Sequence, residues 1–257
     1  MSDFPQPVFD QQPLPPLPPV PEREPFWGYN DLLLFLGLAP VCMGAGMLLV
    51  KGAISLLHAH PTEVEQLLPA QLVFYLLLFG ALAAAFRVGY DRPFWSSLGW
   101  RPARLPFLWC IVFGMATAIL VAILSSLIRL PDTENEMTQL MESPVGLILM
   151  AIFGVTVAPV CEELAFRGFL QPLLVRSLGV VLGITVASIP FGLLHFWEYG
   201  NSWRHALIIS GAGAAFGVMR QATGSTRAAA LMHASYNGLF FISLLADRKV
   251  ISIPHSW

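Results

Sequence analysis

Charged residues are scarce in this sequence, and their scarcity argues against an ordinary soluble domain. Aspartate, glutamate, lysine and arginine together make up 12% of the 257 residues, whereas soluble domains contain roughly 25%. The net charge is −2, so we expect no nucleic-acid partner. Hydrophobic residues instead make up 56% of the chain. This composition predicts an integral membrane protein that crosses the bilayer several times.

Cysteine is also rare, and the few cysteines do not form a recognisable pattern. Cys42, Cys110 and Cys161 all lie in apolar segments. Their number is odd and no CxxC spacing occurs, so neither a disulfide framework nor a zinc ribbon is expected. We interpret all three as small hydrophobic packing residues.

The N-terminal segment lacks the basic and apolar regions of a secretory signal peptide. Nine of the 21 prolines fall between Pro5 and Pro25, a composition that favours polyproline II and cannot build a core. We predict that residues 1–26 form a proline-rich, disordered cytoplasmic tail and that residues 27–257 form the integral membrane domain. A ligand for a proline-recognising partner is the alternative interpretation of the tail.

Seven segments are apolar enough to be membrane-spanning helices, which need about 20 mostly apolar residues. They cover residues 32–50, 72–86, 105–128, 145–161, 178–194, 206–219 and 228–246. Segment 206–219 is short, and the positive charges of Arg248 and Lys249 near the C-terminus disagree with an odd number of spans. We therefore predict an all-α, polytopic membrane bundle of seven or eight transmembrane helices.

The arginines are concentrated in alternate loops, which indicates the orientation of the bundle. Loops rich in arginine stay in the cytoplasm, so we expect the N-terminus inside and the acidic third loop outside. The arginines in question are Arg87, Arg92, Arg101, Arg104, Arg176, Arg220 and Arg227, and the acidic residues are Asp132, Glu134, Glu136 and Glu142.

Polar residues form three clusters within the apolar segments, in the stretches EELAFR at 162–167, FGLLH at 191–195 and HASYN at 233–237. Ionisable residues inside spans are costly and often functional. Glu163 and Arg167 are four residues apart, as are His233 and Asn237, so each pair shares one helix face. Glu162 is rotated by about 100° from its neighbour and is free to face a cavity.

The depths of two clusters disagree if every helix starts at the membrane surface. Glu162 would lie roughly 24 Å from the turn near residue 178, and His233 only about 9 Å from the start of its span. A segment 171–179 that lies along the interface would reconcile them. Pro159 and Pro190 precede the first two clusters, and the kinks they cause are tolerated beside a water-filled cavity. We therefore expect a membrane-embedded polar cavity.

The residue types of the three clusters suit hydrolysis of an amide bond. A carboxylate and a histidine can deprotonate a water molecule, while a second histidine and an amide can stabilise an oxyanion. No serine lies in a GxSxG elbow. The alternative is hydrolysis by a zinc ion that Glu162, His195 and His233 would hold. The HExxH spacing of many zinc proteases is absent. We therefore favour a site without a metal or other cofactor. Buried polar pairs that only fix helix packing remain a further alternative.

The three motifs resemble those of the CPBP family, the CAAX-protease and bacteriocin-processing membrane proteins also called the Abi family. EELAFR is similar to the family's EExxxR motif, FGLLH to FxxxH and HASYN to HxxxN/D, all in the family's order over residues of about 145–246. The resemblance implies that Glu162 and His195 activate water. It implies that His233 and Asn237 stabilise the oxyanion.

In the same family, Glu163 and Arg167 would be supporting residues, and the fold would be a helical bundle around a cavity within the membrane. The expected function is that of a glutamate-type intramembrane endopeptidase, acting on prenylated CaaX proteins or other membrane-associated peptides. The alternatives are a non-catalytic scaffold or bacteriocin-immunity protein, and a zinc-dependent protease. We expect a protein or peptide substrate, lipidated or not, membrane lipid as the surroundings, and a bacterial inner membrane as the location.

Overall fold

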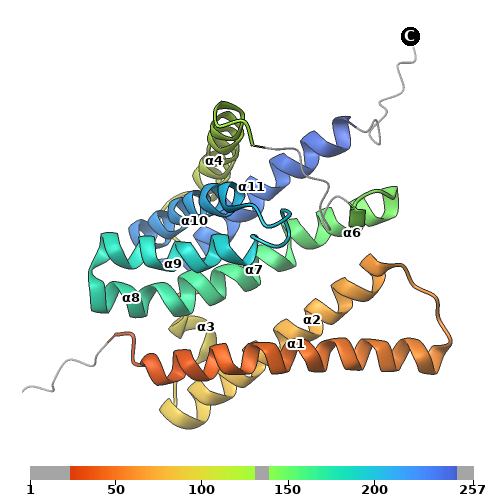
Figure 1. The fold of residues 1–257 in the computed structure, drawn as a ribbon. Coiled ribbons are helices and arrows are strands. Elements are labelled where there is room, and N and C mark those ends of the chain that lie inside the picture. The colour runs from red at the N-terminus through yellow and green to blue at the C-terminus, as the bar shows by residue number, and fades with distance from the viewer. Residues whose placement is uncertain (1–23, 131–138, 248–257) are drawn as a thin grey trace, which may run out of the picture.

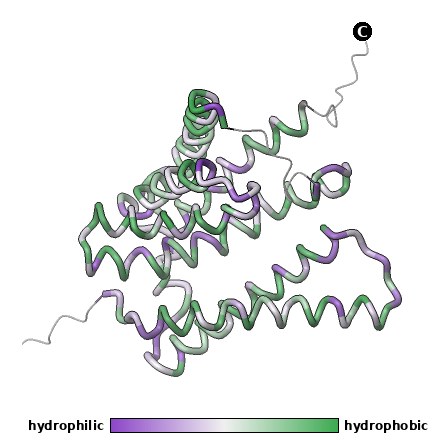
Figure 2. Tube along the Cα trace, in the orientation of Figure 1, coloured by the Kyte–Doolittle hydropathy of each residue, from purple (hydrophilic) through white to green (hydrophobic). Residues whose placement is uncertain are grey.

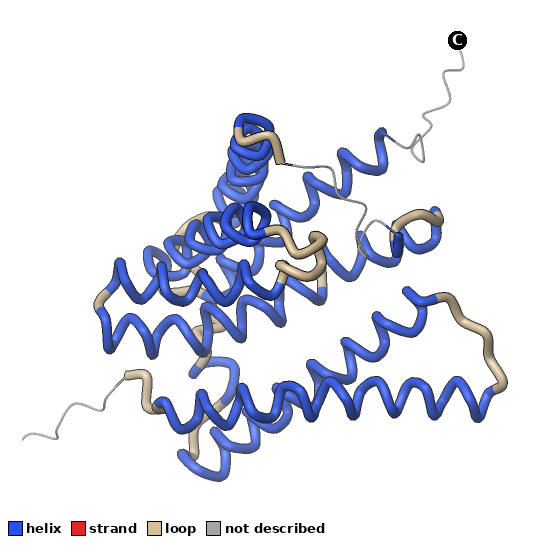
Figure 3. The backbone as a smooth tube through the Cα atoms, viewed as in Figure 1, coloured by secondary structure: helices blue, strands red, loops and turns tan. Residues whose placement is uncertain are grey.

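The computed structural model describes residues 24–130 and 139–247, and in these ranges every regular element is a helix (Figures 1 and 3). The predicted all-α fold is thus confirmed for this part of the chain. Most of the proline-rich tail, the acidic residues Asp132, Glu134 and Glu136, and the C-terminal Arg248 and Lys249 lie outside the described residues.

The first half of the chain forms a long helical hairpin followed by a separate helix. The elements are α1 (Tyr29–Leu57), α2 (Glu63–Tyr90), the short α3 (Phe94–Ser97) and α4 (Phe107–Leu127). Thr62 and Glu65 form a capping box at the start of α2, which satisfies backbone N–H groups where the chain reverses direction. Asp31 closes the corresponding box at the start of α1 by accepting from the backbone N–H of Gly28.

In the second half, four helical pieces follow one another without a loop. They are α6 (Pro144–Val155), α7 (Val157–Glu163), the π-helix η1 (Leu164–Leu170) and α8 (Gln171–Leu178). Next come α9 (Val180–Leu194), α10 (Trp203–Thr223) and α11 (Thr226–Asp247). Figure 1 shows α8, α9 and α10 stacked side by side, with α11 passing behind them and α4 beyond.

All seven predicted segments are helical, although they differ in how well they suit a membrane. Five helical stretches are long and apolar enough to cross it, namely α1, α2, α4, the continuous Pro144–Leu178 and Thr226–Ala246. The helix α9, Val180–Leu194, is a shorter apolar helix. The helix α10 is in neither group, so the number of seven or eight spans stays a prediction for the chain described by residues 24–130 and 139–247.

The outer surface of the bundle is apolar, as a surface in contact with lipid must be. Leu48 and Leu57 on α1 are 73% and 77% exposed, and Val181 on α9 is 76% exposed. Figure 2 shows hydrophobic residues along the middle of most helices, with hydrophilic residues gathered near loops and at helix contacts. Exposed apolar surface of this extent identifies an integral membrane protein.

The arginine-rich loops meet at one end of the bundle. Arg101 donates from Nε to the carbonyl of Gly224 over 2.9 Å, and Arg176 donates to the carbonyl of Pro25. The backbone N–H of Thr226 donates to the carbonyl of Gly99 over 2.9 Å. The positive segments therefore share one side, as the predicted orientation requires.

The helix α11 starts with buried residues that pack against the segment after α3. Ser225 and Thr226 are fully buried, and the hydroxyl of Thr226 donates to the carbonyl of Leu98 over 2.5 Å. The segment from Gln171 to Leu178 continues the helix as α8, so the suggestion that it lies along the interface is wrong. His233 nevertheless reaches Glu162 and Glu163, so the first and third clusters meet in the fold.

The contact between α4 and α11 provides a test of this packing. A Cβ atom on Gly114 would overlap the carbonyl oxygen of Met232 and lie 2.8 Å from the Cβ of Ser235. We expect Gly114→Ala to lower the free energy of unfolding by about 1–3 kcal/mol, because α4 must move away from α11. Thermal unfolding in detergent measures this loss.

Gly44→Ala is the matched control, because a Cβ there meets no atom within 4 Å. It should leave stability unchanged or raise it by up to about 1 kcal/mol, through helix propensity. Equal effects at both positions would contradict the close α4–α11 crossing.

Candidate active site

The helix that carries the two glutamates is irregular on both sides of them. The α-helix breaks at Thr156, whose φ and ψ are −115° and −71°, three residues before Pro159. After Glu163 the chain continues as the π-helix η1, a rare form that occurs often at functional sites. Glu162 and Glu163 therefore lie in a short α-helical piece between a break and a π-helical turn.

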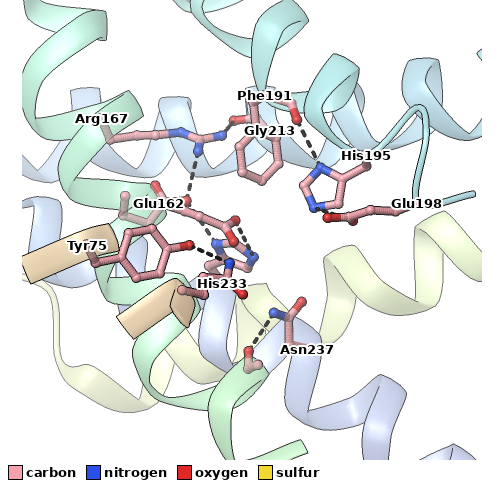
Figure 4. A network of polar contacts seen from close by, with 12 residues as sticks. Tyr75, Glu162, Arg167, Phe191, His195, Glu198, Gly213, His233 and Asn237 are labelled. Atoms are coloured by element: carbon pink, nitrogen blue, oxygen red, sulfur yellow. Dashed lines mark hydrogen bonds and ion pairs between the residues drawn. The ribbon is translucent and has the colours of Figure 1, made fainter. Parts of the chain in front are cut away.

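Glu163 and Arg167 form a buried ion pair, as their spacing predicts. Nη1 of Arg167 donates to Oε1 of Glu163 over 2.8 Å, and their side chains are 1% and 0% exposed (Figure 4). Nη2 of Arg167 donates to the carbonyl of Gly213 on α10 over 2.6 Å. The guanidinium lies 4.3 Å from the ring centre of Phe191, where a cation–π contact adds to the pair.

Glycine at position 213 allows this approach. A Cβ there would lie 2.9 Å from Nη2 of Arg167 and 2.7 Å from the ring of Phe191. A Cβ on Gly217, one turn later, would lie 2.8 Å from Oε1 of Gln171. The small residues of α10 thus serve close packing within the chain.

His233 on α11 lies between the two glutamates. Its Nδ1 is 3.0 Å from Oε1 of Glu163, and its Nε2 is 3.9 Å from Oε2 of Glu162. The ring stacks on Phe216, with ring centres 4.6 Å apart. Because Glu163 has no hydrogen to donate when ionised, Nδ1 of His233 carries the proton of this bond.

A cavity of about 410 Å³ lies in front of this cluster, between the α1–α2 hairpin and helices α6, α7 and α11. Glu162 lines it, with its side chain 20% exposed, whereas Glu163, Arg167 and His233 are buried behind it. The walls are largely apolar and include four methionines: Met43, Met47, Met141 and Met150.

His195 lines the same cavity at the end of α9. The last turn tightens, so that the backbone N–H of His195 bonds to the carbonyl of Gly192 at 3.2 Å rather than to that of Phe191. The carbonyl of Phe191 is thereby available to Nδ1 of the His195 ring, 3.0 Å away. A carbonyl only accepts, so Nδ1 carries a hydrogen and the neutral ring presents an unprotonated Nε2.

Glu198 is a residue of this site that the sequence analysis missed. Its Oε2 lies 3.8 Å from Nε2 of His195, and it lines the cavity (Figure 4). The sequence signal that could have identified Glu198 is the i, i+3 spacing of His195 and Glu198 in the stretch HFWE. Tyr199 lines the cavity as well, and burial raises its pKa, with smaller contributions from Tyr236 and Glu198. The phenol of Tyr199 therefore stays protonated.

Asn237 reaches the cavity from α11, one turn after His233. Its Nδ2 donates to the carbonyl of Gly154 on α6 over 2.7 Å (Figure 4). The amide has a second N–H to offer. His233, on the same helix face, does not line the cavity and contacts the two glutamates instead.

The zinc alternative depends on where the candidate ligands lie. Within the parts of the chain that the structure describes, no three His, Cys, Asp or Glu side chains are placed to hold a metal ion. The ring nitrogens of His195 and His233 face different carboxylates, Glu198 and the glutamate pair. The choice between a metal-free site and a zinc site stays a prediction.

Comparison with known families supports the resemblance seen in the motifs. Residues 144–239 match the family described as type II CAAX prenyl endopeptidase Rce1-like. In this segment the chain is similar to that family. The match contains all three motifs and runs from the start of α6 into α11, which confirms the predicted likeness to the CPBP family. The match covers 96 of the 257 residues and supports a CAAX-type membrane protease at the level of the family. No curated protein and no solved structure matches the chain.

The buried pair behind the cavity predicts a large effect on stability. Arg167→Met leaves the carboxylate of Glu163 without its guanidinium partner, so we expect a loss of about 3–5 kcal/mol in the free energy of unfolding. The double variant Glu163→Gln/Arg167→Met removes both charges, so its free energy of unfolding should fall by less than that of the single variant. Thermal and denaturant unfolding in detergent would rank the variants.

The pair Arg87–Asp91 is a matched control, since it has the same i, i+4 spacing but is 73% and 85% exposed. Arg87→Met should change stability little, because solvent screens this pair. A single variant Arg167→Met as stable as Arg87→Met would contradict the assigned role of the buried pair.

Proposed function

We propose that the protein is a metal-independent intramembrane endopeptidase in which Glu162 is the general base. The observation that carries the proposal is the position of Glu162, a carboxylate that faces an apolar cavity while a buried histidine and a second carboxylate lie behind it. A carboxylate in such surroundings has few waters to solvate it, which favours its use as a base. The match of residues 144–239 to a protease family supports the same assignment.

In the proposed reaction, a water molecule lies between Glu162 and His195 in the cavity. The carboxylate of Glu162 takes one proton as the water oxygen attacks the carbonyl carbon of the scissile peptide bond. Nε2 of His195 accepts a hydrogen bond from the same water and orients it. Glu162 then gives the proton to the amide nitrogen as the C–N bond breaks, so the base is restored.

The negative charge that develops on the carbonyl oxygen needs donors in the cavity. The second N–H of Asn237 and the phenol of Tyr199 are the groups we assign to this role, since both line the cavity and Tyr199 keeps its proton. His233 acts from behind: it is held by Glu163 through Nδ1 and faces Glu162 through Nε2. It therefore positions the base, in place of the oxyanion role expected from the motif.

The substrate class follows from the apolar walls. A cavity lined by methionine, leucine and phenylalanine suits a peptide that is lipidated or embedded in the membrane. A prenylated CaaX peptide is the candidate that the family description suggests. We further propose a bacterial cell membrane as its location, which the compact length of the chain suits.

A non-catalytic scaffold is the second candidate function. It is favoured by the buried contacts of Arg167 with Glu163 and Gly213, which join two helices whether or not a reaction occurs. Substitution of Glu162 separates the two functions, since it faces the cavity and takes no part in those contacts.

Glu162→Gln should lower the rate of cleavage by at least about 10²-fold, because the amide cannot accept the proton of water. The measurement is hydrolysis of a farnesylated CaaX peptide, its non-prenylated form and an apolar transmembrane peptide by the purified protein. A strong zinc chelator should leave the wild-type rate unchanged.

Glu63→Gln is the control, at an exposed glutamate at the start of α2. Full activity of Glu162→Gln would refute the base assignment, and loss of activity with chelator would restore the zinc alternative. A folded wild type that cleaves none of the three peptides would favour the scaffold.

Glu198→Gln should lower kcat about tenfold and leave KM and thermal stability unchanged, because Glu198 acts through the imidazole of His195 and is 44% exposed. His195→Gln should cause the larger loss in kcat. A variant Glu198→Gln with wild-type kcat would remove Glu198 from the site.

A further inference from the structure

A second cavity, of about 590 Å³, lies at the end of the bundle where the arginine-rich loops meet. It is bounded by the segment before α1, by α3, by α8 and by the end of α10. Arginine side chains from four separate segments line it: Arg92, Arg101, Arg176 and Arg220. This cavity shares no lining residue with the one that contains Glu162.

Two of these guanidinium groups each make one hydrogen bond and lie close against a glycine. Arg220 donates from Nε to the hydroxyl of Thr226 over 3.0 Å, and its Nη2 lies 2.5 Å from where a Cβ of Gly99 would be. Arg101 donates from Nε to Gly224, and its Nη2 lies 2.9 Å from where a Cβ of that glycine would be. Each group is thus fixed through one nitrogen, with further N–H donors remaining.

Three of the four arginines have no carboxylate partner in the part of the chain that the structure describes. In residues 24–130 and 139–247, no carboxylate lies within ion-pair distance of Arg101, Arg176 or Arg220. Glu24 lines the cavity without such a contact to these three. Arg220 lies beyond the apolar part of α10. Burial is the main cause that lowers the pKa of Arg220 to about 10, and the nearby charge of Arg101 is the smaller cause.

We propose that this cavity binds a phosphoryl group, supplied by an anionic phospholipid headgroup or by a soluble phosphate compound. Guanidinium groups form paired hydrogen bonds with phosphate oxygens, and the sequence has 12 arginines but only two lysines. The cavity lies at one end of the helices, beside the loops rich in arginine, and basic pockets between the ends of spanning helices are known to recognise lipid headgroups. Its volume exceeds that of a single phosphate, which leaves room for the group that carries it.

The test measures binding by the full chain in neutral detergent. Native mass spectrometry would follow the binding of phosphatidylglycerol, phosphatidylcholine with the same acyl chains, and inorganic pyrophosphate. The variant Arg101→Gln/Arg176→Gln alters two exposed arginines of the cavity. The control Arg87→Gln/Arg227→Gln removes the same charge at exposed positions that do not line it.

Wild type and control should bind phosphatidylglycerol or pyrophosphate, and the cavity variant should bind it at least roughly tenfold more weakly for each arginine replaced. If the cavity variant binds phosphatidylglycerol more weakly than the wild type, the phosphoryl group comes from a lipid. If the variant is weaker only toward pyrophosphate, the phosphoryl group comes from a soluble compound. Equal binding of all three proteins, equal binding of the two lipids with no binding of pyrophosphate, or no binding by the wild type would overturn the proposal.

A second measurement needs no variant and stays valid if the double variant does not fold. Phenylglyoxal modifies accessible arginines, and peptide mapping reports each position. The bound phosphoryl compound should protect Arg101 and Arg176 of the wild type by several-fold, and leave Arg87 as reactive as before. Equal protection at all three positions, or none, would contradict the site.

Discussion

The carboxylate of Glu163 is the group on which the core of the bundle depends. It is fully buried in a membrane protein, where an unpaired charge would destabilise the fold by several kcal/mol, on the order of the whole stability of a domain. Arg167 and His233 both bond to its Oε1, and Arg167 continues to the carbonyl of Gly213. One buried charge therefore fixes α7, η1, α10 and α11 relative to one another.

This constraint also determines where Glu162 can go. Its neighbour is held on the inner side, so the rotation of about 100° per residue turns Glu162 toward the cavity. The break at Thr156 and the π-helical turn after Glu163 leave the backbone around the pair free to adopt this arrangement. His233 then reaches both carboxylates from one ring, which couples the structural glutamate to the one that faces the cavity.

Contacts within one helix could be predicted from the sequence, and contacts between helices mostly could not. The pairing of Glu163 with Arg167 follows from four-residue spacing alone. The contact of His233 with the two glutamates does not, because it joins α11 to α7, which lie about 70 residues apart in the chain.

The bond from Asn237 to Gly154 and the position of Glu198 beside His195 were likewise outside the reach of the sequence. The first joins residues 83 positions apart, and the second depends on how α9 ends. Both belong to the packing of helices, which hydrophobic periodicity does not specify. The motifs identified the residues of the site, and the fold decided which of them face the cavity.

The methionines opposite Glu162 have a consequence for selectivity. Thioether side chains are unbranched and polarisable, and they adjust to apolar partners of different shape. Met43, Met47, Met141 and Met150 thus give the cavity a deformable apolar lining beside Glu162. For the proposed peptidase, such a lining would accept side chains of similar hydrophobicity but different shape.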